Sequence, residues 1–410
     1  MKEPIAINAF IFAGSFSIGV MNAGFNLKEV LEISDDQPKQ NAFYFIKNYP
    51  NIPVILPSKW ENDEYLNNLK NENIDLMCCN CPCSSLSSIN RHASVDGKNN
   101  IHFYRLFNIF EQVQPKVFVV ENAPTLIKLG KPILNDLVNK LSYLYKFTII
   151  HDKAGNHGVA MSRMRTLIVG WRKDHFEKHP LINPDIQKIT SVKDLFGDIL
   201  DNTVDDHKSK NYDDIRCLYK YTNQNFSFMT ALAKHYLKQF ENDTDEDAKI
   251  IEETINNSKH KREFYNIVNK LITKKNIWDK SPFRPKMNQV WPSFSSVQEY
   301  MHPIQNRTLN MLELKRLMNY PDEFSFDDPN HECTIPVAQA IAQGVPANFG
   351  KWISSQVKQA LDNSLDTLDV NDCVVFQDHI KLKYEVKSID DFINSEIKIT
   401  KYAKDLYKEN

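Results

Sequence analysis

The 410-residue sequence lacks several features that would place it in a membrane or outside the cell. No uninterrupted apolar run reaches the ~18 residues that suggest a transmembrane helix, so we expect no membrane span. The N-terminal segment has no basic region and no convincing cleavage site, which is unlike a signal peptide. The seven cysteines are odd in number and four of them crowd into residues 78–83, which is unlike a disulfide framework. We therefore expect a reducing, cytoplasmic location.

The sequence has no strong overall charge. Hydrophobic residues make up 42% of the chain and charged residues 25%, which is ordinary globular composition, and the net charge is -2. A protein that binds nucleic acid need not be basic overall but should carry a local basic stripe. Residues 259–286 contain nine lysines and arginines against two acidic residues. This stripe is typical either of a solvated helix face or of a surface that follows phosphates.

Short apolar runs alternate with helical patterns over the first 170 residues. Strands are expected at 5–12, 30–34, 74–79, 117–121, 147–151 and 166–171, and helices at 40–48, 102–112 and 133–144. This alternation predicts βαβ units, and therefore an α/β fold with a mostly parallel, doubly wound sheet. In such sheets ligands bind at the carboxyl ends of the strands.

The same patterns predict how the chain is divided. We expect residues 1–174 to form a catalytic and cofactor-binding part and 175–298, rich in Lys, Asn and Asp, to form a smaller second domain. Regular patterning returns over 299–360, which we expect to rejoin the catalytic domain. Residues 361–410 would be a C-terminal accessory segment, whose role the pattern does not indicate.

An unusual cysteine cluster ends one of the expected strands. Residues 74–83 read IDLMCCNCPC and precede a long polar loop. Buried structural cysteine is one interpretation, since it is the commonest fate of this residue. A zinc site is another, although the spacing is not the usual CxxC pair and no second pair follows, so we expect no metal. The third is a thiolate nucleophile, Cys83, at a strand end where a loop can close over substrate.

Two further segments carry polar side chains at the ends of expected strands. Residues 117–124 read VFVVENAP and end in Glu121 and Asn122, while Arg163 and Arg165 directly precede the strand expected at 166–171. An acid and a cysteine at the ends of two parallel strands can converge on one crevice. Alternate residues of an extended segment point the same way, so both arginines could face one pocket. A surface glutamate and solvated arginines are the alternatives.

The order of these segments resembles the DNA cytosine-C5 methyltransferase family. The resemblance covers roughly residues 5–172 and 300–355, and the part between them is where this family places its target-recognition domain. Each motif alone is weak to moderate, but seven in the correct order are strong together. The matching segments are Phe12-Ala13-Gly14 with Gly19 and Ala23-Gly24-Phe25, then Glu32, Pro82-Cys83, Glu121-Asn122, Arg163-Met164-Arg165, the stretch from Arg307 to Pro321, and Ile341–Pro346.

The resemblance implies a Rossmann-like fold dependent on S-adenosylmethionine and a partner of double-stranded DNA. It implies that Cys83 adds to C6 of a flipped-out cytosine, that Glu121 acts at N3, and that Arg163 and Arg165 orient the ring. We expect a monomer in the cytoplasm of a bacterial or phage-infected cell. The cofactor-binding residues would be Phe12, Ala13, Gly14, Ser15, Phe16, Glu32, Asn80, Gln343 and Val345. The residues at the DNA or the base would be Pro82, Ser84, Ser85, Ser87, Asn90, Arg91 and Asn122.

The sequence departs from the family pattern mainly at the cofactor. Phe10 stands where the family has Asp, two glycines of the first turn are Phe16 and Ser17, and the Asn of the last motif is Gln343. Glycine would allow close backbone approach, so these changes predict a reshaped donor pocket.

Several alternatives follow from this departure. A modified donor, such as carboxy-S-adenosylmethionine or a methylene-folate, is an alternative to S-adenosylmethionine. A catalytically inactive DNA-binding homologue is another, and an RNA cytosine-C5 enzyme of the same fold is a third. A nicotinamide-dependent dehydrogenase is excluded, because the first turn lacks GxGxxG.

Overall fold

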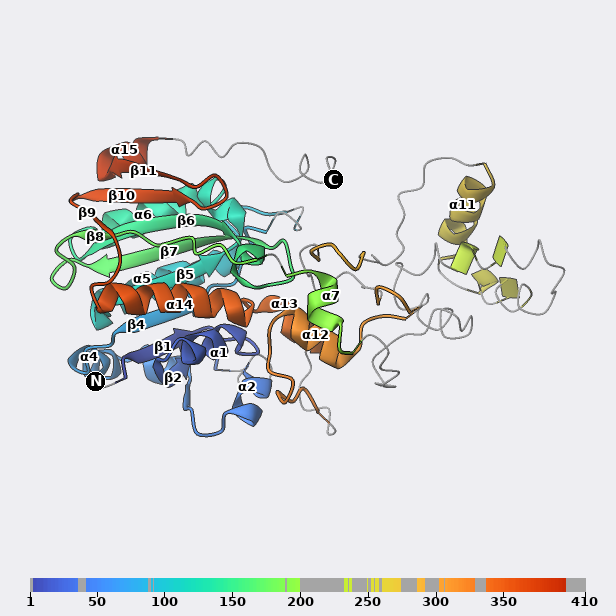
Figure 1. The fold of residues 1–410 in the computed structure, drawn as a ribbon, viewed down its shortest axis with the longest axis horizontal. Coiled ribbons are helices and arrows are strands. Elements are labelled where there is room, and N and C mark those ends of the chain that lie inside the picture. Colours follow the sequence, from blue (N-terminus) through green and yellow to red (C-terminus); the bar gives the residue numbers. More distant parts are fainter. Residues whose placement is uncertain are drawn as a thin grey trace. The chain divides into compact units, whose positions relative to one another are not determined.

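The chain forms two compact units, each described here by itself (Figure 1). The first comprises Met1–Thr190 with Leu317–Asn410, and the second comprises Ser191–Arg316. The sequence pattern predicts divisions after 174 and 298 instead. Residues 175–190 belong to the first unit because they pack along it: β8 (His179–Pro180) pairs with β9 (Thr367–Leu368).

The computed structural model describes most of the first unit and part of the second. The described residues are 3–35, 42–87, 90, 92–188, 190–199, 232–234, 236–237, 249, 252–253, 255–257, 260–273, 286–291, 302–305, 307–328 and 337–395. No helix among them is both long enough and apolar enough to cross a membrane.

A nine-stranded sheet is the centre of the first unit, in the order β11-β10-β6-β7-β5-β4-β1-β2-β3. Pairing is parallel from β3 through β5 and between β10 and β6, while β7 runs antiparallel to both β5 and β6, and β11 antiparallel to β10. The predicted mostly parallel α/β sheet is therefore confirmed. The strands are β1 (Ile5–Ala9), β2 (Asn26–Leu31), β3 (Val54–Ile55), β4 (Leu76–Asn80), β5 (Val117–Asn122), β6 (Tyr145–Lys153), β7 (Met164–Arg172), β10 (Cys373–Asp378) and β11 (Lys383–Ser388).

All six strands predicted from the sequence are present with shifted ends. The first ends at Ala9 rather than at residue 12. It ends there because Phe10 and Phe12 have φ angles of 60° and 51°, in the left-handed region that a strand cannot include.

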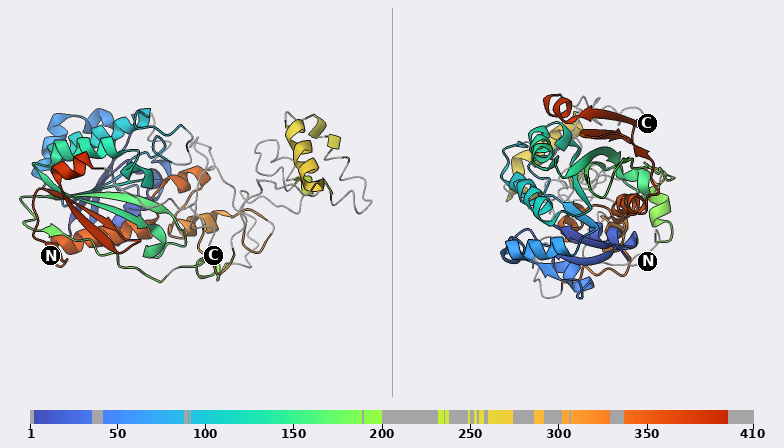
Figure 2. Two further views of the ribbon diagram at one scale, coloured as in Figure 1. Left: turned by 90° about the horizontal axis from the view of Figure 1, so that it is seen from above. Right: turned by 90° about the vertical axis from the view of Figure 1, so that its left-hand side faces the viewer.

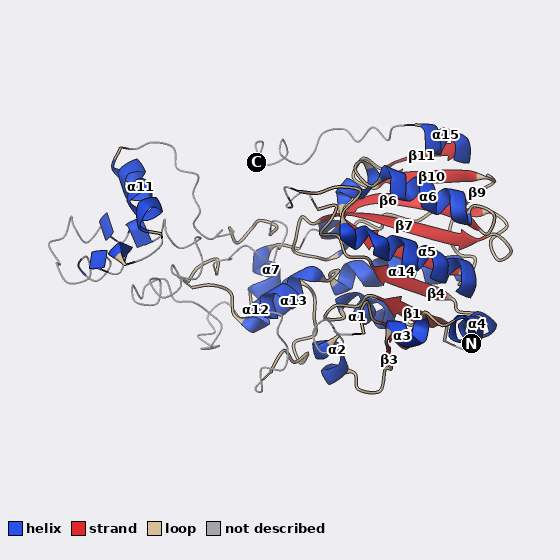
Figure 3. Ribbon diagram, turned by 180° about the vertical axis from the view of Figure 1, so that it is seen from behind, coloured by secondary structure: helices blue, strands red, loops and turns tan. Residues whose placement is uncertain are grey.

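Helices cover both faces of the sheet (Figures 2 and 3). Side chains of α4, α5, α6 and α15 share one hydrophobic core with the strands, and α1 and α14 pack against each other. Figures 1 and 3 show these two sets on opposite faces, as in a doubly wound fold. The helices of the first unit are α1 (Ser15–Asn22), α2 (Phe43–Asn48), α3 (Pro57–Trp60), α4 (Asp63–Asn71), α5 (Ile101–Val113), α6 (Lys131–Leu141), α13 (Val337–Gln343), α14 (Ala347–Leu361) and α15 (Ile389–Asn394).

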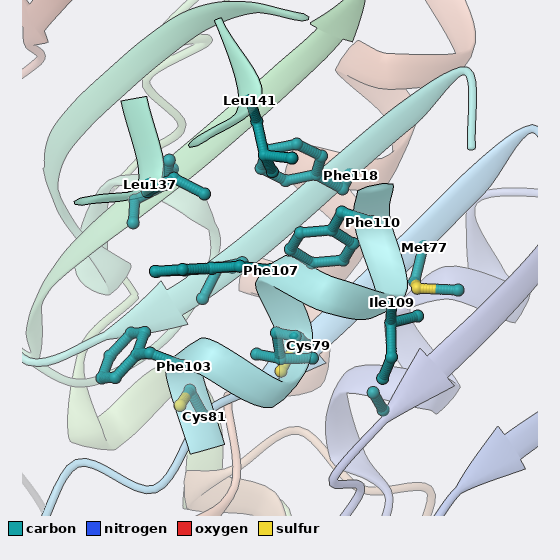
Figure 4. Close-up of a cluster of buried hydrophobic side chains, with 14 of the residues drawn as sticks. Met77, Cys79, Cys81, Phe103, Phe107, Ile109, Phe110, Phe118, Leu137 and Leu141 are labelled. Carbon is teal, nitrogen blue, oxygen red and sulfur yellow. The ribbon is translucent and has the colours of Figure 1, made fainter. Parts of the chain in front are cut away.

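Aromatic side chains of α5 fill the core beside β4 and β5 (Figure 4). Phe103, Phe107 and Phe110 recur at helical spacing and are fully buried. The ring of Phe110 stacks on Phe118 of β5 with centroids 4.1 Å apart. Cys79 of β4 belongs to the same cluster, so this layer joins α5 to both strands.

The segment after residue 361 is an integral part of the first unit. β10 continues the sheet by pairing with β6, and β11 forms the outer edge. Val374 of β10 and Phe392 of α15 lie in the main core. Lys131 of α6 donates to the Phe392 carbonyl at 2.5 Å, which ties α15 to α6.

The described part of the second unit contains short helices, α7 (Val192–Phe196), α11 (Lys261–Ile272) and α12 (Met311–Leu317). Helix α11 buries Phe264 and exposes Lys261, Arg262 and Lys270. Lys286 is exposed as well, and the other basic residues of the predicted stripe lie outside the described residues. Arg307 donates to both carboxylate oxygens of Glu313, at 2.9 and 2.8 Å.

Truncation of Phe392 tests whether the C-terminal segment contributes to the main core. Phe392→Ala removes a buried ring and should lower the free energy of unfolding by about 3–5 kcal/mol, measured by urea denaturation. Ile186→Ala is the matched control, because Ile186 is 51% exposed and should change stability by less than about 0.5 kcal/mol. Equal effects of the two substitutions would contradict an integral role.

Candidate functional site

The ends of β4 and β5 place two motifs of this sequence side by side. Asn80 of β4 pairs in register with Glu121 of β5. The side chain of Asn122 donates to the Cys81 carbonyl at 3.0 Å. The chain that follows β4 is thus held beside Glu121, and Cys83 lies three positions after the paired Asn80. We call this end of the sheet, where β4, β5, β6 and β10 end and β7 begins, the carboxyl edge.

The four clustered cysteines have different surroundings. Cys78, Cys79 and Cys81 are buried, and burial raises the pKa of each thiol, so these groups stay protonated. Cys83 is partly exposed, unlike any other described cysteine. Burial fits the structural interpretation for the first three, whereas the side chain of Cys83 is partly accessible. In the described part of the chain, no three His, Cys, Asp or Glu side chains could hold a metal ion.

Arg165 forms an ion pair with Glu121, between Nε and Oε1. The side chains are only 12% and 7% exposed, so the pair is largely withdrawn from water. The contact arises because β7 runs antiparallel to β5 and begins at the carboxyl edge, with Leu167 opposite Glu121.

Arg163 has different partners from Arg165. Its Nη1 donates to the Ala342 carbonyl at 3.1 Å and approaches Met318 Sδ at 3.7 Å. The residue is 4% exposed. The extended pattern predicts that both arginines face one pocket, but their partners differ: Arg165 pairs with Glu121, whereas Arg163 bonds to the last motif at Ala342.

The loop after Cys83 folds against its own beginning. Ser84 accepts hydrogen bonds from Asn90 at its carbonyl and from Asn99 at its hydroxyl, at 2.8 and 2.6 Å. Ser85 is buried, and a Cβ at Gly97 would lie 2.5 Å from its side chain. Pro82 and Ser87 are partly exposed and Asn90 is exposed, whereas Arg91 lies outside the described residues.

The turn between β1 and α1 requires glycine at one position. Gly14 has φ 89°, and a Cβ there would lie 2.2 Å from the ring of Phe45. Both the backbone angle and the close contact exclude other residues. Phe12 and Ala13 lead into this turn, as the family motif implies.

Two residues that follow Gly14, Ser15 and Phe16, pack against the last motif and α14. A Cβ at Gly350 of α14 would lie 2.7 Å from the ring of Phe16, so this ring fills the contact between α1 and α14. Ser15 is in contact with Gly344, which lies between Gln343 and Val345. Gln343 is half-buried and Val345 is buried. The bulky side chain at position 16 therefore does not itself narrow the turn.

Two buried polar side chains lie near this turn. Asn80 is the last residue of β4, and Glu32 directly follows β2. Glu32 is 1% exposed and accepts a hydrogen bond from the Ile33 amide at 2.6 Å. Asn80 is 2% exposed, and its Oδ1 has no hydrogen-bond partner in the part of the chain that the structure describes. A buried acceptor of this kind is usually satisfied by water or a ligand. With the glycine turn, these groups fit the polar parts of a nucleoside cofactor.

Sequence reasoning missed a buried cluster at the ends of β6 and β10. Asp152 Oδ2 accepts from His157 Nε2 at 2.8 Å and lies 2.7 Å from His379 Nδ1. Burial alone would raise the pKa of Asp152, but the two histidines lower it to about 2. His157 also stacks on Trp352, with centroids 3.7 Å apart. No local pattern indicates this cluster, since His379 is 227 residues from Asp152.

The sheet and its carboxyl edge define an α/β methyltransferase fold, and solved structures agree. One is described as a prophage-encoded DNA modification methyltransferase of E. coli, with a TM-score of 0.58, 18% identity, and coverage of 88% of this chain and 100% of that one. Another is the Entamoeba histolytica methyltransferase EhMeth, with a TM-score of 0.54, 12% identity, and coverage of 89% and 100%.

The chain belongs to the C-5 cytosine-specific DNA methylase family, whose model matches residues 6–359. The family and enzyme class predicted from the motif order, a DNA (cytosine-5-)-methyltransferase, are therefore confirmed.

Similar curated proteins are type II methyltransferases. M.NgoPII of Neisseria gonorrhoeae is 22% identical over 387 residues, covering 87% of this chain and 96% of the relative. M.PspPI of Psychrobacter is 23% identical, covering 86% and 80%. M.XorII of Xanthomonas oryzae is 26% identical over 208 residues, and the match spans 49% of this chain and about half, 47%, of that relative.

The buried ion pair predicts strong coupling between its two members. Arg165→Ala should lower the free energy of unfolding by about 3 kcal/mol, because it leaves the Glu121 carboxylate without its cation. Adding Glu121→Gln should recover at least about 1 kcal/mol of that loss, measured by urea denaturation of both single variants and the double variant. Additive effects would show that the two side chains do not interact in solution.

Proposed function

We propose that this protein transfers a methyl group from S-adenosylmethionine to carbon 5 of a flipped-out cytosine in double-stranded DNA, through a covalent bond between Cys83 and C6. One observation supports the proposal: the register of β4 and β5 pairs Asn80 with the buried, arginine-paired Glu121, and the chain that continues from Asn80 leads within three residues to Cys83, the partly exposed cysteine of the cluster. A DNA-binding protein without activity would have no chemical use for this arrangement.

The first step activates the base. Cytosine C5 is too weak a nucleophile by itself, and addition of the Cys83 thiolate to C6 pushes the electron pair of the C5–C6 double bond toward C5. Glu121 delivers a proton to N3, which neutralises the charge that builds on the ring. Arg165, beside Glu121, is placed to bind the base oxygen at C2.

The second step forms the new bond and restores the enzyme. With S-adenosylmethionine bound, the electron pair on C5 would form a bond to the methyl carbon, and the bond between that carbon and the sulfonium sulfur would break with its electron pair left on sulfur. The proton on C5 then leaves to a bound water, and the pair of electrons of that C–H bond re-forms the C5–C6 double bond. The C6–sulfur bond breaks, so Cys83 leaves as a thiolate, and Glu121 recovers its proton from N3. The exposed loop after Cys83 is suited to cover the flipped base and to exclude water.

S-adenosylmethionine supplies an electrophilic methyl group when bound. The residues that would hold it are the turn at Phe12–Gly14, Glu32 at the end of β2 and the unsatisfied Asn80 oxygen. Gln343 and Val345 adjoin this turn through Gly344 and Ser15. Because the Phe16 ring packs on α14, the altered turn gives less support to a modified donor than the sequence alone does.

The remaining parts of the proposal concern the partner. The second unit would contact base edges in the major groove, as a target-recognition domain, and the enzyme would act as a monomer. Relatives named type II methyltransferases favour a place in bacterial restriction-modification, and hence in the cytoplasm.

Covalent trapping tests the proposed nucleophile. Duplex DNA with 5-fluorocytosine, incubated with S-adenosylmethionine, should form a stable adduct, because fluorine at C5 cannot leave as a proton and the elimination stops. Cys83→Ala should abolish the adduct on a denaturing gel, and Cys81→Ala, its matched control, should retain it. An adduct that survives Cys83→Ala would refute this mechanism, and no adduct with the native protein would favour an inactive binder.

Mass analysis of nucleosides tests the transferred group and the substrate. DNA from cells that express the protein should contain 5-methylcytosine above the level in cells expressing Cys83→Ala. A heavier 5-substituent would show a modified donor. Modification of transfer RNA in place of duplex DNA, compared in vitro with labelled S-adenosylmethionine, would instead show an RNA enzyme.

A further inference from the structure

The turn between β10 and β11 lies at the carboxyl edge. We call Ile380, Lys381, Leu382, Lys383 and Tyr384 the hairpin tip. β10 runs parallel to β6 and therefore ends where the catalytic strands end. In Figure 1 this turn lies at the right-hand end of the sheet.

The distance between the hairpin tip and the end of β5 can be estimated from the strand register. Asn122 of β5 pairs with Thr166, which pairs with His151, which pairs with Asp378 of β10; Asp378 pairs in turn with Lys383. At ~4.8 Å for each step between strands, Asp378 is about 14 Å and Lys383 about 19 Å from Asn122. The major groove alone is ~12 Å wide. A duplex with its flipped base at Glu121 can therefore reach the hairpin tip.

The hairpin tip exposes apolar side chains that contribute little to the core. Ile380 is 40% exposed, Leu382 64% and Tyr384 56%. Leu382 has φ 52°, a left-handed conformation that is unfavourable for a residue with a branched side chain. Single exposed leucines are common. An exposed leucine with an unfavourable backbone conformation, next to two other exposed apolar side chains, instead favours a binding surface.

The charge of the hairpin tip is positive. Lys381 is 44% exposed and only loosely paired with Asp378, at 3.7 Å. Lys383 is exposed and has no ion-pair partner among the residues that the structure describes. The neighbouring Glu385 is paired with Lys387 at 3.6 Å. Two lysine ammonium groups are thus available to an anionic partner.

The hairpin tip is rigidly attached to the sheet. The Asp378 carboxylate accepts hydrogen bonds from the amides of Ile380 and Lys381, each at 3.1 Å. Directly before the tip, the His379 side chain is 3% exposed and bonds to Asp152, and its amide donates to the His151 carbonyl at 3.0 Å. A preorganised turn loses little entropy when it binds a partner.

We propose that the hairpin tip is a second DNA-binding site, separate from the target-recognition domain. Lys381 and Lys383 bind phosphates that flank the flipped cytosine, and Leu382 packs on the adjacent sugars. The inference rests on the proposed function, because it places the duplex at the carboxyl edge. It assigns a role in DNA binding to the segment after residue 361, for which the sequence indicates none.

The salt dependence of DNA binding tests the two lysines. Each phosphate contact contributes a slope of about -0.9 to the dependence of log affinity on log salt concentration, so Lys381→Ala with Lys383→Ala should reduce the slope by about 1.8. At about 50 mM salt the affinity should fall at least tenfold, measured by fluorescence anisotropy with a labelled duplex. Lys70→Ala with Lys178→Ala is the matched control, since both lysines are exposed at the opposite end of the sheet.

The outcomes separate this inference from the proposed function. If the native protein forms the Cys83 adduct but the variant of Lys381 and Lys383 binds like the control pair, the second site is refuted and the proposed function stands. If the native protein does not bind duplex DNA, both are refuted.

Leu382→Asn tests the apolar contact without disturbing the turn. Asparagine tolerates the left-handed region, so stability should be unchanged or slightly higher. Affinity for duplex DNA should fall several-fold with no change in the salt slope, because no charge is removed. Unchanged affinity would show that Leu382 does not touch DNA.

Discussion

The reversed direction of β7 determines which side chains meet at the reaction centre. A parallel strand between β5 and β6 would begin at the far end of the sheet and would carry its first residues away from Glu121. Because β7 is antiparallel to both neighbours, its N-terminal residues arrive at the carboxyl edge. Arg165 can then pair with Glu121, and Arg163 can hold the Ala342 carbonyl.

Much of the fold is predictable from this sequence because its strands are short, apolar and fully buried. The positions of all six early strands follow from hydrophobic runs, and the family follows from seven motifs in order. Strand ends are less predictable: β1 ends early, at Ala9, because Phe10 has a left-handed backbone angle that an apolar pattern does not reveal. The direction of β7 is not visible in periodicity either, since period two is the same in both directions.

The candidate site likewise has parts that the sequence predicts and parts that it does not. Cys83, Glu121 and Arg165 are predictable because each lies next to a strand end, and register brings strand ends together. The position of the Phe16 ring is not predictable, because it depends on Gly350, far along the chain. The cluster of Asp152, His157 and His379 is equally hidden, since its members meet only after β10 has joined β6.

The late position of α14 and β10 in the chain has a consequence for synthesis on the ribosome. The first 190 residues leave the ribosome before the segment that pairs with β6 and covers α1 has been made. At 5–20 residues per second, translation of the inserted second unit takes roughly 6–25 s. During that interval the free side of β6 is an unpaired strand edge, and the surface around Phe16 is bare. Chaperones that shield apolar surface would then bind the nascent chain, and the second unit is synthesised while the first is still incomplete.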